Sequence, residues 1–201
     1  MLITGTQNKK LKQIFNMLPA QTMGHSMRTG LLLQTFTEDL IETAPVLIGG
    51  TSGSIGATDM IFCAREFGFY HHLGDVTLPG RDEDASAVRD MISSVFDGAW
   101  NSGGYYMTSL LQTIETNCLR WDGKDGGMEK GKKIPFWGRA CAVAGTFDEL
   151  CFKGAYTPRK AMKRLAELSG SVLDPELVTA FIKCYPAVRS LEQRPACRRS
   201  S

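Results

Sequence analysis

The stretch Phe67-Gly-Phe-Tyr-His-His-Leu-Gly-Asp75 sets two adjacent imidazoles, His71 and His72, between an aromatic run and a glycine. Apolar residues at helical spacing predict a helix over residues 57–73, with the two histidines in its last turn. Neighbours on a helix point about 100° apart, so one imidazole could face a cavity while the other points elsewhere. The structural alternative is a helix-terminal pair that interacts with the helix dipole and a nearby carbonyl. The only other histidine is His25, so an imidazole site must join residue 25 to residues 71–72.

Helical spacing also accounts for the apolar residues elsewhere, and no segment of the sequence alternates as a strand does. One helix is predicted over residues 8–18, and a long amphipathic helix runs from His25 towards Pro45, with His25 and Arg28 on one face. The fold class is therefore all-α, a single bundle of about seven or eight helices. The other predicted helices cover residues 88–96, 105–119 and 139–152, and two more follow the N-cap and proline pairs Thr157-Pro158 and Asp174-Pro175.

Length and charge restrict the domain organisation and the partners. The 201 residues suit one domain, residues 1–190, followed by a flexible basic tail, residues 191–201. The 23 basic and 21 acidic residues give a net charge of +2, too little to attract nucleic acid or an anionic membrane. No apolar run is long enough to span a bilayer. The six cysteines form no CxxC pair and no signal peptide precedes them, so we expect a reduced, cytoplasmic protein with mostly buried thiols.

Two glycine-rich segments invite a phosphate-binding interpretation. Residues 49–56 lack both the Gly-x-Gly-x-x-Gly order and a Gly-Lys-Ser/Thr end, so we interpret them as a flexible connection. Residues 122–133 combine glycines with lysines, which suits a phosphate ligand but is more typical of a solvated surface loop. Arg120 and Asp122 at its start are expected to pair and fix the loop.

Several phrases occur in the order found in a known family. His25-Ser-Met-Arg28 resembles a first metal-binding histidine and its following arginine, and residues 70–75 resemble a His-Asp-x-Gly-Lys signature. Arg120-Trp-Asp-Gly123 and residues 139–150 and 173–178 resemble the closing third of the same pattern. From residue 20 to 185 the chain thus resembles a divergent, degenerate HD-GYP-type member of the HD-domain metal-dependent phosphohydrolases. The resemblance implies an all-helical fold whose active members hold two or three metal ions, often iron or manganese, and hydrolyse c-di-GMP.

Carried over position by position, the resemblance implies that most metal ligands are lost. His25 and His71 are retained, whereas the metal-bridging aspartate of the signature is His72 and its lysine is Asp75. The Gly-Tyr-Pro of the branch's name is absent from residues 124–128. The remaining lost ligand positions are Asn117 and Cys118, where the family has a histidine pair, and Gly145, where it has a late aspartate.

These replacements remove negative charge from the site. Two divalent cations about 3.5–4 Å apart repel each other, and anionic bridging ligands make that spacing tolerable. A neutral imidazole has one lone pair in its ring plane and cannot bridge two ions. At best one mononuclear site remains, with a single divalent ion (Fe, Mn or Zn) on His25, His71 and His72 or a nearby carboxylate. Cys118 is a possible zinc ligand, although we expect a buried structural thiol there.

Three functions remain as alternatives. The first is a catalytically deficient HD-GYP-like module kept for binding or signalling linked to c-di-GMP, with Arg28 and Lys124 as candidate phosphate-binding residues. The second is a residual metal-dependent phosphodiesterase with a mononuclear site. Because the first two alternatives differ in catalysis, the sequence does not decide whether the protein is an enzyme. The third is a protein-interaction module, a homodimer or a partner of a cyclic-dinucleotide synthase, with residues 122–133 as the contact surface.

Overall fold

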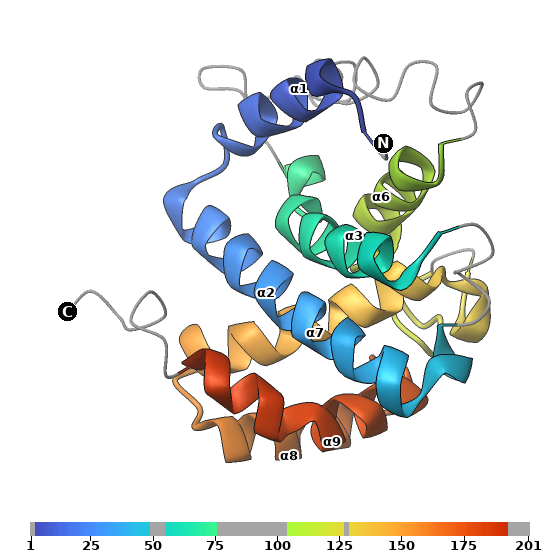
Figure 1. The fold of residues 1–201 in the computed structure, drawn as a ribbon. Helices are drawn as coiled ribbons and strands as arrows, with labels where there is room; N and C mark the ends of the chain where they lie inside the picture. The colour runs from blue at the N-terminus through green and yellow to red at the C-terminus, as the bar shows by residue number, and fades with distance from the viewer. Residues whose placement is uncertain (1–2, 49–54, 76–103, 127–128, 193–201) are drawn as a thin grey trace.

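The described residues of a computed structural model are 3–48, 55–75, 104–126 and 129–192, and within them the chain is all-α. The only strand-like pairing there is an isolated bridge between Ser169 and Leu173. The predicted fold class is confirmed. Figure 1 shows the α-helices, which are α1 (Gly5–Phe15), α2 (Ala20–Thr43), α3 (Ala57–Tyr70), α6 (Tyr105–Thr116), α7 (Phe136–Phe152), α8 (Pro158–Leu168) and α9 (Pro175–Glu192). Short 3-10 helices are η1 (Pro45–Leu47), η2 (Leu73–Asp75) and η3 (Gly131–Lys133).

The helix starts follow local capping chemistry. Both N-cap and proline pairs are confirmed: the Thr157 hydroxyl accepts a hydrogen bond from the Lys160 backbone, and the Asp174 carboxylate accepts one from the Glu176 backbone. Helix α2 begins five residues before His25, directly after Pro19, which is its N-cap. The predicted helix over 88–96, the segment 49–54 and the tail residues 193–201 lie outside the described residues, and α9 extends through residues 191–192.

Helix α2 is the centre of the bundle. It packs against α3, α7 and α9, and α8 in turn packs on α7 and α9 (Figure 1). Fully buried side chains from these helices meet in one core, to which the helix that carries His25 contributes. Among the largest are Leu33 and Phe36 of α2, Phe67 of α3, Phe147 of α7 and Phe181 of α9.

Helices α2 and α3 approach each other backbone to backbone. A Cβ atom on Gly68 would lie 2.6 Å from the Gly30 Cα, and a Cβ on Gly30 would lie 2.7 Å from the Arg65 carbonyl oxygen and overlap the Phe69 ring. Only glycine allows such a crossing, because any side chain at either position would separate the two helices. Gly68 lies three residues before His71, so the crossing also fixes how close His71 comes to α2.

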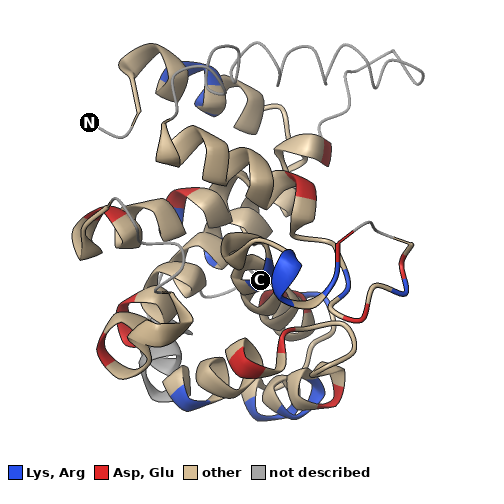
Figure 2. Cartoon of the chain, turned by 90° about the vertical axis from the view of Figure 1, so that its right-hand side faces the viewer, with Lys and Arg blue, Asp and Glu red and all other residues tan. Residues whose placement is uncertain are grey.

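Of the five cysteines in the described residues, Cys63, Cys141 and Cys184 are buried, as predicted for most of the thiols. Burial raises the pKa of the Cys63 thiol to about 12 and likewise that of Cys184, so both stay protonated. The expectation for Cys118 is wrong, because this thiol is exposed just after the end of α6. Basic and acidic residues are interspersed over the helices (Figure 2). No helix among the described residues is long and apolar enough to cross a membrane.

Replacement of Gly68 by alanine tests the helix crossing. The added Cβ overlaps the Gly30 backbone, so we expect Gly68→Ala to lower the free energy of unfolding by about 1–3 kcal/mol, the usual range for overpacking. The measurement is urea unfolding followed by circular dichroism. Gly5→Ala is the matched control, because a Cβ there meets nothing within 4 Å. Equal stability of the two variants would contradict the crossing.

Candidate metal centre

The three histidines of the chain gather at one place. His25 comes from the second turn of α2, His71 is the C-cap of α3, and His72 follows it. The His25 ring centroid lies 5.3 Å from that of His71 and 5.2 Å from that of His72, and the latter two are 4.0 Å apart. One ligand atom from each lies within 4.8 Å of the others, which is suitable for holding one metal ion.

Both members of the histidine pair belong to this cluster, although helical spacing alone would have allowed one of them to point elsewhere. The α-helix ends at Tyr70 and the chain tightens into η2 at Leu73. The regular step of 100° per residue therefore no longer sets the two ring directions. The predicted contact of the pair with a nearby carbonyl is present as well, between His71 and Gly68.

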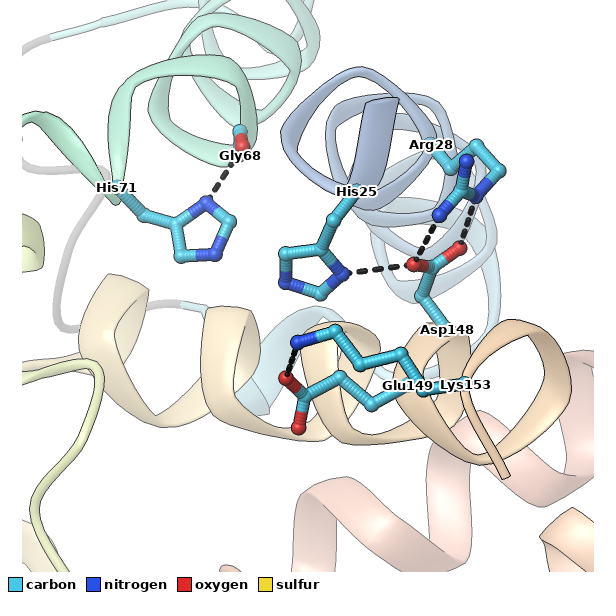
Figure 3. A network of polar contacts seen from close by, with 7 residues as sticks. All are labelled: His25, Arg28, Gly68, His71, Asp148, Glu149 and Lys153. Atoms are coloured by element: carbon cyan, nitrogen blue, oxygen red, sulfur yellow. Dashed lines mark hydrogen bonds and ion pairs between the residues drawn. The ribbon is translucent and has the colours of Figure 1, made fainter. Parts of the chain in front are cut away.

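A hydrogen-bond acceptor engages the Nδ1 atom of every ring. His25 Nδ1 lies 2.7 Å from Asp148 Oδ2, and His71 Nδ1 lies 2.7 Å from the Gly68 carbonyl oxygen (Figure 3). His72 Nδ1 contacts the Asp75 carboxylate. Because carbonyl and carboxylate oxygens only accept, each neutral ring carries its proton on Nδ1 and keeps a lone pair on Nε2. Metal-binding histidines are typically oriented in this way.

Burial keeps the pair His71 and His72 uncharged. It lowers the pKa of His71 well below its usual value, and the neighbouring imidazoles of His72 and His25 lower it further. Burial also lowers the pKa of His72, against the opposing effect of Asp75. Neutral imidazole is the form that binds metal, so these two ligands need not lose a proton near neutral pH.

Asp148 holds the α2 side of the site, and the sequence analysis missed its role. Its carboxylate is 1% exposed on α7 and accepts hydrogen bonds from Arg28 Nε at 2.6 Å and Arg28 Nη2 at 3.0 Å, besides contacting His25 (Figure 3). Arg28 also stacks on the Phe152 ring at 3.9 Å. The available signal was one acidic residue on the otherwise apolar face of the predicted helix 139–152.

Of the positions where the resemblance implies a lost ligand, His72 belongs to the cluster, and Gly145 and Asn117 lie beside it. A Cβ on Gly145 would lie 3.7 Å from His25 Nε2, so a side chain at 145 would face the imidazoles. Asn117 donates from its amide to the His71 carbonyl oxygen at 3.2 Å and to the last carbonyls of α6. Asn117 thus ties α6 to the histidine pair, whereas Cys118 is exposed.

The two candidate phosphate-binding residues contact different acidic partners. Arg28 joins the cluster through Asp148, and Lys124 is 79% exposed, with its amine 3.9 Å from Asp122 in the loop. The expected pairing of Arg120 with Asp122 is confirmed by two hydrogen bonds of 2.9 and 2.8 Å, which hold the pKa of Asp122 at about 2. Residues 127–128 of the loop lie outside the described residues.

Comparison with known proteins supports the resemblance drawn from the motifs. No family model matches the chain. A protein of Thermotoga maritima named cyclic di-GMP phosphodiesterase is 25% identical over 90% of the chain. The chain spans about half the length of this relative. The predicted resemblance is thereby confirmed as a distant similarity to a protein named cyclic di-GMP phosphodiesterase.

Replacement of Asp148 tests the buried network. Asp148→Asn keeps the shape but removes the charge that Arg28 and His25 contact, so we expect a loss of about 3 kcal/mol in the free energy of unfolding. Urea unfolding measures it. Glu167→Gln is the control, because its exposed pair with Arg164 should contribute less than about 1 kcal/mol. Similar losses in both variants would argue against the network.

Acidity should destabilise the metal-free protein through His71. Folding lowers the pKa of His71, so below its usual value of 6.5 the unfolded chain binds more protons than the folded one. The contribution of neutral His71 to the free energy of unfolding is therefore fully present above pH 6.5 and decreases as the pH falls below that value. Urea midpoints between about pH 7.5 and about pH 5.5 measure the slope, which should be smaller in His71→Asn. Identical slopes for the variant and the wild type would count against this assignment.

Proposed function

We propose that this chain is a catalytically deficient, HD-GYP-like module that binds one divalent metal ion through His25, His71 and His72. It acts as a binding or signalling module linked to c-di-GMP, the substrate for which the Thermotoga maritima relative is named. The observation that carries the proposal is a cluster of three oriented imidazoles with no carboxylate at positions 72 and 145. The predicted cytoplasmic location, signalling partner and homodimer belong to the same proposal.

The charge of the site favours one ion over two. Asp148 is the buried carboxylate nearest to the cluster, and its oxygens already accept hydrogen bonds from Arg28 and contact His25. A second cation about 3.5–4 Å from the first would then lack an anionic bridge among the described ligands. Three nitrogen donors also suit zinc or iron better than manganese, which prefers oxygen ligands.

The residues around the cluster have distinct roles in this proposal. The three Nε2 atoms would hold the ion, while Asp148, the Gly68 carbonyl and Asp75 fix the ring directions from behind. A bound divalent ion would supply Lewis acidity toward a phosphodiester oxygen. Arg28 lies beside the cluster and would add positive charge toward an anionic ligand, with Lys124 as the second phosphate-binding candidate.

A residual mononuclear phosphodiesterase is the second candidate. Three histidines with a vacant fourth position are a ligand set that hydrolytic zinc sites use, and the geometry of the cluster favours this possibility. Both candidates require the same ion, so metal binding does not distinguish them. They differ in the rate at which c-di-GMP is hydrolysed.

Turnover of c-di-GMP separates them. We expect the purified protein, supplied with zinc, iron(II) or manganese, to bind about one ion per chain and to hydrolyse c-di-GMP below about 1 s⁻¹, the lower end of typical enzymes. Elemental analysis and product chromatography are the measurements. His25→Ala should lose the ion, whereas the double variant His72→Asp/Gly145→Asp, which restores both carboxylates, should raise turnover. Faster turnover of the wild type would support the phosphodiesterase instead, and absence of bound metal would remove both candidates.

A further inference from the structure

The face of α7 that looks at the histidines carries a second acidic residue, Glu149. Gly145 faces His25 Nε2, and Glu149 follows one helical turn later on the same side. Helical side chains lean toward the N-terminus, so Glu149 extends back over the turn where Gly145 has no side chain. Figure 3 shows the Glu149 and Lys153 side chains reaching along α7 below the His25 ring.

The Glu149 carboxylate is turned toward Lys153 in this structure, with Oε1 2.7 Å from Lys153 Nζ.

A metal ion on three neutral imidazoles would leave two positive charges in a largely buried site. Such a charge is costly without an anionic partner. Two nearby carboxylates already serve behind the rings, Asp148 at His25 and Asp75 at His72. Glu149 differs from them, because its partner is Lys153 and the side chains of this pair are 46% and 50% exposed. Exposed ion pairs are weak, so the carboxylate can exchange Lys153 for a stronger cation at little cost.

We infer that Glu149 supplies the fourth, anionic ligand of the metal site and replaces the carboxylate lost at position 145. The inference rests on the proposed metal site. On metal binding the Glu149 side chain turns from Lys153 to the ion, which gives a mononuclear site of three histidines and one glutamate. In this site the carboxylate from α7 comes from position 149, whereas the family resemblance implies one at position 145.

Zinc titration of three proteins tests the inference. The probe is zinc alone, measured by competition with a chromophoric chelator, so no enzymatic activity is needed. Glu149→Gln should weaken zinc binding by roughly tenfold or more, since even loss of an outer partner costs a metal site about that much. Glu167→Gln is the matched control, with a similarly exposed glutamate in a similar pair, and should bind zinc as the wild type does.

A rescue variant excludes a merely structural role. In Gly145→Asp/Glu149→Gln the carboxylate returns to the position facing His25, so zinc affinity should recover. The free energy of unfolding of the metal-free double variant should show only the changes that the two single variants already show. Equal affinity of Glu149→Gln and Glu167→Gln overturns the inference but leaves the three-histidine site intact. Failure of the rescue contradicts the claim that positions 145 and 149 serve the same ion. Absence of zinc binding by the wild type refutes the proposed metal site itself.

Discussion

The backbone contact between Gly30 and Gly68 is the constraint on which the site depends. It brings α2 and α3 so close that a Cβ on Gly68 would lie 2.6 Å from the Gly30 Cα. His25 lies five residues before one glycine and His71 three residues after the other, so the crossing sets their separation. Helices with side chains between them pack 8–10 Å apart, and short imidazoles from two such helices would meet less closely.

The electrostatics of the site are divided between an outer and an inner layer. The outer layer contains two carboxylates, Asp148 behind His25 and Asp75 behind His72, which engage Nδ1 and leave Nε2 of each ring toward the cluster. The inner layer has no carboxylate at positions 72 and 145, which are a histidine and a glycine. Orientation of ligands and neutralisation of the ion are separate requirements. The first is met in this structure, and a metal ion would still need an anion for the second.

Much of the fold was predictable because helices are determined locally. Apolar periodicity identified α1, α2, α3, α6 and α7, and the cap and proline pairs located the starts of α8 and α9. The boundaries were less accurate: α2 begins directly after Pro19 and not at His25, and α3 ends at Tyr70, before the histidine pair. The exposure of Cys118 was missed for a similar reason: it follows α6, where burial depends on what packs on the helix end.

For the site, the sequence by itself determined its components: three histidines, an arginine one turn after the first, and no carboxylate at the positions the resemblance marks as metal ligands. Only the tertiary structure decided that both His71 and His72 face His25. It also decided that Asp148 on α7 contacts His25 and Arg28, which lie 123 and 120 residues earlier in the chain. Residue types and helical spacing are properties of a segment. Ring direction at a helix end and the pairing of a buried carboxylate depend on how separate helices pack, which no single segment encodes.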